Sequence, residues 1–214
     1  MQNMIIFANQ EPMTNDHHIR TRLKSKTVGI AGCGGLGSNC AVALARVGVG
    51  KLVIADFDKV EVSNLNRQYF FADQVGMPKV TALRANIHRI DKDIVVESHE
   101  LTLHPGNIPE IFGNCDVMVE AFDSAEMKLM IVETVTEKMP GKPLVCGVGL
   151  AGWGENCDIG MKVFDNVYIC GDHAREVSPD FPPIAPRVGI VANMEANQVL
   201  EILLGRMNDG NNAE

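Results

Sequence analysis

The sequence lacks the features of several large protein classes. No apolar run approaches the roughly 18 residues that a membrane-spanning helix requires. The N-terminus has a short apolar patch but no basic segment before it, so we predict no signal peptide. Acidic residues outnumber basic ones, and a formal net charge of -8 argues against a nucleic-acid partner. We therefore expect a cytoplasmic protein that binds neither membranes nor nucleic acids.

Paired cysteines are also absent. None of the six cysteines stands in a C-x-x-C pair; they are Cys33, Cys40, Cys115, Cys146, Cys157 and Cys170. Structural zinc sites typically use such pairs, so no zinc site is predicted. The spacing does not resemble the dense disulfide framework of a small secreted domain either. Reduced thiols in a cytoplasmic protein are the simplest interpretation.

What the chain does contain is an alternation of apolar strands and helices. Its 214 residues suit one domain over 1–214. Strands are predicted at 26–32, 51–56, 93–101, 116–122 and 143–149, with helices at 38–50, 78–91 and 124–139. Such alternation is typical of a mostly parallel sheet covered on both faces, a Rossmann-like α/β fold.

Both ends of the chain depart from this alternation. The polar residues 1–24 indicate an N-terminal arm, either loose or forming a helix that lies across a partner. Residues 160–172 predict a hairpin around Asp165-Asn166, hence a C-terminal antiparallel extension. A proline-rich loop (178–187) and a final helix from about 188 to 204 follow. Residues 205–214 are expected to be a frayed tail.

A glycine-rich loop joins the first strand to the first helix. It satisfies G-x-G-x-x-G with Gly32, Gly34 and Gly37, and Gly35 is a fourth glycine. Glycines permit a tight turn and close backbone approach, and the helix N-terminus attracts phosphate. Asp56 follows Gly37 at the distance expected of a ribose-binding carboxylate. The loop therefore predicts a bound nucleotide without saying which one.

Three polar side chains favour a nucleoside triphosphate over a dinucleotide. Asn64 and Arg67 follow Asp56 closely, and Lys79 stands in the first turn of the next helix. An NADP enzyme would place the 2′-phosphate on Arg67, but Asp56 would then repel that phosphate. With ATP, Asp56 takes the ribose while the amide, guanidinium and ammonium groups contact phosphates. For Lys79 alone, a solvent-facing side chain is the alternative.

Asp123 stands at the carboxyl end of the strand 116–122, the edge where open α/β sheets bind ligands. A carboxylate there suits Mg²⁺ bound to a triphosphate. The alternative is structural, because Asp123 and Glu126 have the spacing of a helix capping box.

The motifs GCGGLGS, DFDKVEVSNLNRQYFF, GMPKV and EAFDS, in this order, resemble the ThiF/MoeB/HesA family of ubiquitin-activating-like adenylyltransferases. The similarity covers about 26–205 and is greatest to the short ThiF-type members. It implies ATP-dependent adenylylation of the C-terminal Gly-Gly carboxylate of a ubiquitin-fold sulfur carrier, in thiazole biosynthesis for thiamine. The resemblance also implies a homodimer.

Residue roles carry over by motif. The resemblance implies that the glycine loop and Asp56 hold adenosine, that Asn64 contacts phosphates, and that Arg67 and Lys79 contact phosphates and act in catalysis. It also implies that Asp123 binds Mg²⁺ and is catalytic. Alternatives from the residues are an NAD(P)-dependent oxidoreductase and a nucleotide-binding scaffold without catalysis, although a scaffold has no use for Arg67, Lys79 and Asp123 together.

Several features depart from the family pattern. The loop 171–187 has no cysteine, so we expect the reaction to end at the acyl adenylate, with Cys33, Cys146 and Cys170 buried and inert. Larger members supply an N-terminal arginine across a dimer, for which this chain has only Arg20 and Arg22. Trp153 either lines a groove for the carrier tail or packs against the domain.

Overall fold

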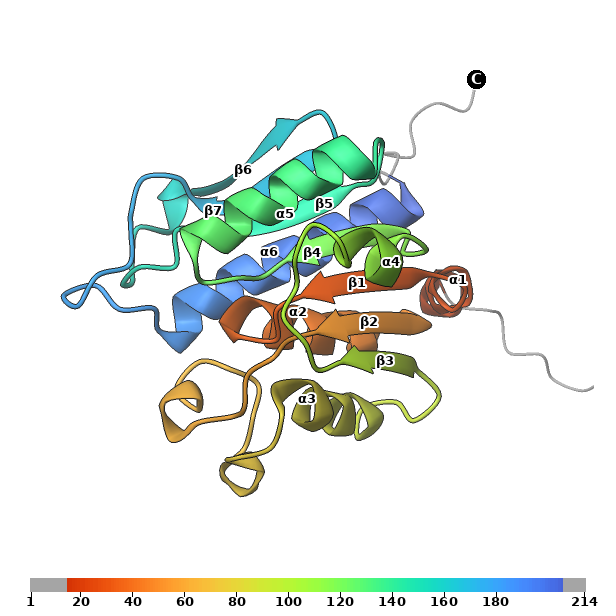
Figure 1. The fold of residues 1–214 in the computed structure, drawn as a ribbon, viewed down its shortest axis with the longest axis horizontal. Helices are drawn as coiled ribbons and strands as arrows, with labels where there is room; N and C mark the ends of the chain where they lie inside the picture. Colours follow the sequence, from red (N-terminus) through yellow and green to blue (C-terminus); the bar gives the residue numbers. More distant parts are fainter. Residues whose placement is uncertain (1–14, 206–214) are drawn as a thin grey trace, which may run out of the picture.

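The structure is a computed structural model, and it describes residues 15–205 (Figure 1). One sheet contains all seven strands of this range: β1 (Thr27–Ala31), β2 (Lys51–Ala55), β3 (Val95–His99), β4 (Val117–Glu120), β5 (Leu144–Val148), β6 (Ile159–Phe164) and β7 (Val167–Asp172). The α-helices are α1 (Asn15–Leu23), α2 (Gly35–Val47), α3 (Lys79–His88), α4 (Ile108–Phe112), α5 (Ala125–Lys138) and α6 (Ala185–Leu204).

The strand order is β3-β2-β1-β4-β5-β7-β6. Every neighbouring pair is parallel except β6 and β7, which form the predicted antiparallel hairpin with Phe164 opposite Val167. The chain builds outward from β1 in one direction through β2 and β3, then crosses back to place β4 on the other side of β1. The predicted Rossmann-like α/β class is confirmed. Ligands in such sheets bind where the winding reverses, outside the carboxyl ends of the strands.

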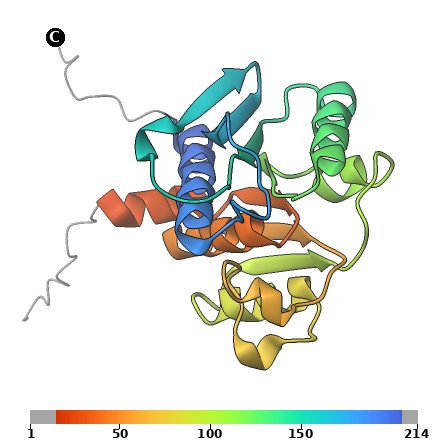
Figure 2. The same ribbon diagram turned by 90° about the vertical axis from the view of Figure 1, so that its left-hand side faces the viewer.

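Helices cover both faces of the sheet, so its central strands are mostly apolar. On one face α2, α3 and α6 cover the sheet and join one apolar core through residues such as Leu44, Leu83 and Val191. The helix α2 packs on β1, α3 on β3, and α6 on β4 and β5. On the other face α4 and α5 pack through Phe112 and Ile131. Figure 2 shows the sheet between α6, drawn in blue, and α5, drawn in green. The double cover explains why these strands read as continuous apolar runs rather than as alternating ones.

The N-terminal prediction needs correction where the structure describes it. Residues 15–23 form α1, which packs on its own domain, so this part of the predicted arm is not loose. The contact of α1 with a partner stays a prediction. Leu23 is fully buried, and the guanidinium of Arg22 donates to the carbonyl of Leu204 at 2.7 Å. Arg20 likewise donates to the carbonyl of Arg46 at 3.1 Å. Residues 1–14 of the predicted arm and 206–214 of the predicted tail lie outside the described residues.

Candidate functional site

A cavity of about 1150 Å³ opens along the carboxyl edge of the sheet. Its walls include residues at the carboxyl ends of several strands, such as Gly32 after β1, Asp56 after β2, Asp123 after β4, Gly149 after β5 and Asp172 at the end of β7. This is the edge at which the sequence placed the site. Of the predicted residues, Gly34, Gly35, Arg67 and Lys79 also line the cavity, whereas Gly37 and Asn64 do not.

The glycine loop is shaped by two close approaches. Gly32 has a φ of 97°, in the region that L side chains rarely adopt, and a Cβ there would lie 2.8 Å from the carbonyl oxygen of Ala121. A Cβ on Gly37 would lie 1.9 Å from the carbonyl oxygen of Gly32. Gly37 thus serves the packing of α2 against the loop, and Gly34, the N-cap of α2, exposes the helix N-terminus to the cavity.

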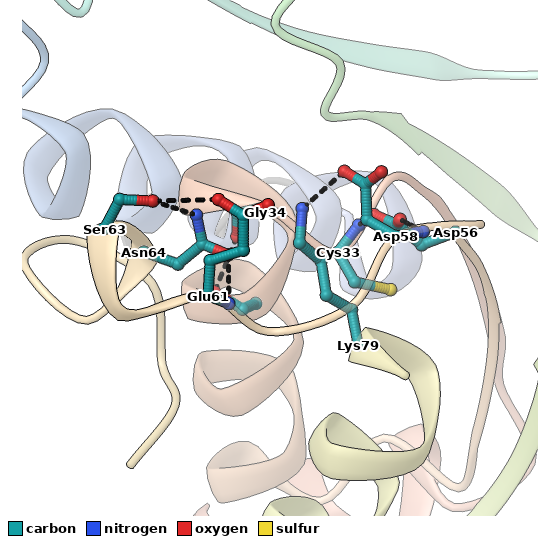
Figure 3. Close-up of polar contacts among 9 residues, drawn as sticks. Cys33, Gly34, Asp56, Asp58, Glu61, Ser63, Asn64 and Lys79 are labelled. Atoms are coloured by element: carbon teal, nitrogen blue, oxygen red, sulfur yellow. Dashed lines mark hydrogen bonds and ion pairs between the residues drawn. The ribbon is translucent and has the colours of Figure 1, made fainter. Parts of the chain in front are cut away.

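Asp56 braces this loop from the end of β2. One carboxylate oxygen accepts a hydrogen bond from the backbone N–H of Cys33 at 2.6 Å, and the other accepts from the N–H of Asp58 at 2.8 Å (Figure 3). Each oxygen retains a lone pair, and the residue faces the cavity. The carboxylate is therefore fixed beside the glycine loop, where the ribose role was predicted.

Lys79 is not the solvent-facing lysine of the alternative interpretation, because only 6% of the residue is exposed. Its ammonium lies 2.7 Å from a carboxylate oxygen of Asp58, and its backbone N–H donates to the Asp58 carbonyl (Figure 3). A cation in the first turn of α3 opposes the helix dipole, and Asp58 offsets that cost. The sequence analysis missed Asp58, although the D-x-D spacing after β2 was its signal.

Arg67 and Asn64 have different placements. Arg67 is half-buried at the cavity wall, and its guanidinium donates to the carbonyl of Ser63 and the side chain of Asn66. Asn64 is buried in a 3₁₀ turn (Val62–Asn64), where its side-chain oxygen accepts from the N–H of Glu61. Figure 3 shows Glu61, Ser63 and Asn64 grouped apart from the Lys79–Asp58 pair. Asn64 thus stabilises the turn that carries Arg67, and its predicted phosphate contact stays a prediction.

Asp123 is exposed at the cavity and makes no hydrogen bond within the described residues. The capping-box alternative is wrong in its residues, because Ser124 is the N-cap of α5 and its hydroxyl accepts from Met127. A single carboxylate suits Mg²⁺, which keeps several waters and takes its other ligands from substrate phosphates. Within 15–205 no group of three or more His, Cys, Asp or Glu side chains is arranged to hold a metal ion alone.

A second ion pair at the cavity was not predicted. The Lys128 ammonium lies 3.0 Å from both carboxylate oxygens of Glu120 and donates to the carbonyl of Gly147 at 2.8 Å. Burial raises the pKa of Glu120, and Lys128 opposes that rise. The pair joins β4, α5 and β5 beside Asp123. Lys128 lies one turn after Ser124 in α5. Nothing in the sequence indicated that its side chain reaches back to β4.

The cysteines are reduced thiols in the structure. Cys33, Cys146 and Cys170 are buried as predicted, and burial raises the pKa of each thiol, in Cys170 to about 12. Cys157, which the prediction omitted, is exposed. Trp153 is 68% exposed, so the packing alternative is wrong, and it does not line the cavity. Its contact with a carrier stays a prediction.

The sheet is Rossmann-like, and its carboxyl edge carries a glycine loop, cations and a carboxylate at the spacing expected of a ribose ligand. These features together are typical of a nucleotide-binding domain. The profile of the ThiF family matches residues 9–214. The chain therefore belongs to the ThiF family, as the motifs indicated.

Two relatives are similar over most of the chain. The SAMP-activating enzyme E1 of Haloferax volcanii is 32% identical over 191 residues, covering 86% of this chain and 63% of that protein. The adenylyltransferase and sulfurtransferase MOCS3 of Dictyostelium discoideum is 30% identical over 194 residues, covering 85% and 44%. The chain thus spans less than two thirds of the length of either relative.

A solved structure has the same fold. The E. coli tRNA N6-threonylcarbamoyladenosine dehydratase TcdA, in complex with ATP, superimposes with a TM-score of 0.77 at 21% identity, covering 87% of this chain and 88% of that chain. At that identity the likeness concerns the fold. Finally, no helix within residues 15–205 is long and apolar enough to cross a membrane.

Proposed function

We propose that the protein adenylylates the C-terminal Gly-Gly carboxylate of a ubiquitin-fold sulfur carrier with MgATP, in thiazole biosynthesis for thiamine. The observation that carries the proposal is the gathering of Arg67, Lys79 and Asp123 around one cavity with the glycine loop. Two cations and one free carboxylate serve a magnesium triphosphate better than they serve nicotinamide. Membership of the ThiF family and similarity to an E1 activating enzyme and to an adenylyltransferase and sulfurtransferase support the same reaction class.

In this reaction a carrier carboxylate oxygen attacks the α-phosphorus of ATP. The new C–O–P bond forms as the bond from the α-phosphorus to the bridging oxygen breaks, and pyrophosphate leaves with that oxygen. Arg67 and Lys79 balance the charge that spreads over the phosphoryl oxygens, and Asp56 with the glycine loop orients the nucleotide. Asp123 would hold Mg²⁺, which neutralises phosphate charge and orients the leaving group.

The finer assignments belong to the same proposal. The thiamine carrier, a ThiS-like protein, follows from the short ThiF-type motifs. A homodimer and a cytoplasmic location are expected on the same grounds. A role for Arg20 or Arg22 across that dimer would require each to exchange its backbone partner, Arg46 or Leu204, for a ligand.

Pyrophosphate exchange into ATP tests the reaction. The protein is incubated with MgATP, labelled pyrophosphate and a ThiS-type carrier ending in Gly-Gly. The matched control is the same carrier without its last two glycines. Exchange should depend on the intact carrier. Exchange that is equal with the shortened carrier, or absent with every Gly-Gly carrier tried, would contradict the proposal.

A thermal shift separates the proposal from the NAD(P) oxidoreductase alternative. We expect MgATP to raise the melting temperature, because a ligand at 100 times its Kd adds about 2.7 kcal/mol to folding stability. NAD and NADH should have little effect. A larger shift with NAD than with MgATP would favour the oxidoreductase instead.

A further inference from the structure

The cavity has two ends that belong to different parts of the sheet. Gly32, Asp56 and Lys79 line the end beside β1 and β2, where the nucleotide is expected. The other end lies beside β5 and β7, beyond Asp123 and β4. Its walls are two loops, 149–154 after β5 and 172–184 after β7, which contribute Gly149 and Arg175 among others.

Arg187 ties these two loops together from the first turn of α6. It is only 2% exposed, which is rare for an arginine. One guanidinium nitrogen lies 3.1 Å from a carboxylate oxygen of Asp172, and another donates to the carbonyl of Gly154 at 2.6 Å. The Nε of Arg187 has no partner within the described residues. The buried guanidinium of Arg187 therefore makes two contacts, one to each loop.

Asp172 completes the tie at the end of β7. It is also 2% exposed, and its second carboxylate oxygen accepts from the backbone N–H of Ala174 at 2.9 Å, which fixes the first turn of the loop. The loop after β5 packs closely on the same residue, because a Cβ on Gly149 would lie 1.8 Å from the carbonyl oxygen of Asp172.

Further contacts hold the outer parts of the two loops in place. The N–H of Gly152 donates to the carbonyl of Pro182 at 3.1 Å. Arg175 lines the cavity and pairs with Glu155 and, at 3.2 Å, with Asp158, so it joins the loop after β7 to the segment before β6. Arg175 is 35% exposed at its side chain, so these ion pairs are weaker ties than the buried one.

We propose that Arg187 and Asp172 are positioning residues for the second substrate. They hold the wall of the cavity that receives the carboxylate-bearing acceptor, and they do not contribute to MgATP binding at the other end. The inference rests on the proposed function, because the reaction needs the acceptor carboxylate beside the α-phosphorus. The nucleotide takes the β1–β2 end, so the acceptor must enter over the β5–β7 wall. A wall displaced by a small distance lowers the effective concentration of the attacking carboxylate.

The test compares Arg187→Met and Arg187→Lys with Arg84→Met, a control at an exposed arginine on α3. Exchange kinetics give the KM of the ThiS-type carrier, and calorimetry gives the Kd of MgATP. We expect the Met variant to raise the carrier KM about tenfold or more while the MgATP Kd changes less than about threefold. The Lys variant should fall between, because a lysine keeps the charge near Asp172 but lacks the planar fork.

Amide hydrogen exchange provides a measurement that does not depend on turnover. In Arg187→Met, exchange should accelerate in 149–154 and 172–184 and stay parental in the glycine loop. If this variant does not fold, Arg175→Gln replaces it, since it removes the outer ion pairs and a 3.7 Å contact with Asp172 but leaves that buried carboxylate paired with Arg187. It should move the same quantities in the same direction by a smaller amount.

The outcomes separate the inference from the proposed function. Three results would overturn the positioning role: an equal loss of MgATP and carrier affinity, an unchanged carrier KM, or an unchanged rate of amide hydrogen exchange in the two loops. If the parental protein shows no carrier-dependent exchange, the proposed function fails instead. Amide hydrogen exchange in the two loops and MgATP affinity then still decide whether Arg187 acts on one wall or on the whole cavity.

Discussion

Lys79 shows how much a single residue of this site depends on its neighbour. A nearly buried ammonium at a helix N-terminus is unfavourable by itself, and the Asp58 carboxylate at 2.7 Å makes it acceptable. Nucleotide phosphates placed in the cavity would compete with Asp58 for the same ammonium. In the proposed reaction, the ion pair would hold the lysine in position before a phosphate arrives.

We expect Lys79→Ala to lower carrier-dependent pyrophosphate exchange by about 10²–10³, the usual cost of losing one charge-stabilising donor. Asp58→Asn should lower it less, since the lysine remains but loses its orienting partner. Lys92→Ala, at an exposed lysine, is the matched control. Parental exchange in Lys79→Ala would show that the lysine serves the fold alone.

Glu195 is a buried carboxyl group that has no such partner. It is fully buried in α6, and neither carboxylate oxygen has a hydrogen-bond partner within residues 15–205. Burial, and then repulsion by Glu120, raise its pKa well above the ordinary value, and Lys128 only partly opposes this rise. The folded protein thus holds the Glu195 proton more tightly than the unfolded chain does.

A pH dependence of stability follows. The stabilisation from the bound proton is complete below the unfolded pKa of about 4.3, and it is lost as the pH rises toward the raised folded pKa. Over that range Glu195 should lower the free energy of unfolding by up to about 1.4 kcal/mol per pH unit. In urea titrations between about pH 5 and 8, Glu195→Gln should flatten this slope, whereas exposed Glu137→Gln should not. Identical slopes in the parent and Glu195→Gln would contradict the assignment.

Residues with a local spacing signal were the ones that sequence could predict. Arg67, Lys79 and Asp123 follow from their motifs, and all three line the cavity. Lys128 and Arg187 were not assigned, because neither contact has the spacing of a local motif: Lys128 pairs with Glu120 on the preceding strand, and Arg187 donates to Gly154, which is 33 residues earlier. The motif predicts that Asn64 contacts phosphates, but in the described structure its side-chain oxygen accepts a hydrogen bond from Glu61 within its own turn.

At the scale of elements, the turn from β1 into α2 is tightly constrained by close backbone approaches. Gly37→Ala would place a methyl group against the carbonyl oxygen of Gly32. We expect a loss of about 1–3 kcal/mol in the free energy of unfolding, as is typical of overpacking, together with weaker MgATP binding. Urea unfolding and calorimetry measure the two effects.

Gly189→Ala on α6 is the control, because a Cβ there meets nothing within 4 Å. This change should stabilise the protein by about 0.5–1 kcal/mol through helix propensity. If Gly37→Ala is as stable as the parent, the close approach is relieved by a movement of α2, and the explanation for Gly37 is wrong.

Elements with a long apolar pattern were predicted within a few residues, as β1, β2, β5 and the β6–β7 hairpin show. The final helix begins at Ala185, earlier than predicted, because a proline is compatible with the first turn. The five-residue helix α4 was not predicted, and its segment is too short to show a helical period. The polar helix α1 owes its place to tertiary contacts, which no local pattern reports.

At the scale of the whole molecule, the cysteines predict where the reaction ends. Acyl transfer to the protein needs a reactive thiolate near the adenylate, and the thiols of Cys33, Cys146 and Cys170 are buried with raised pKa values. We expect the carrier adenylate to be the final enzyme-bound product. Intact mass under non-reducing conditions, after incubation with MgATP and a ThiS-type carrier, checks this.

An adduct between carrier and protein would contradict that expectation. Cys157 is the first residue to test in that case, since its thiol is exposed and lies next to Asp158, which pairs with the cavity residue Arg175. Loss of the adduct in Cys157→Ser would assign the transfer step to it. Retention of the adduct would direct attention to the remaining thiols.

The position of β1 at the centre of the sheet also governs how the chain folds as the ribosome makes it. β1 is made first among the strands, yet its register with β4 pairs Val28 with Val117, about 90 residues later. At about 5–20 residues per second, one edge of β1 waits roughly 4–18 s for its partner strand. During that interval an apolar strand edge is open to other chains, so the yield of folded protein should depend on the synthesis rate and on chaperone supply.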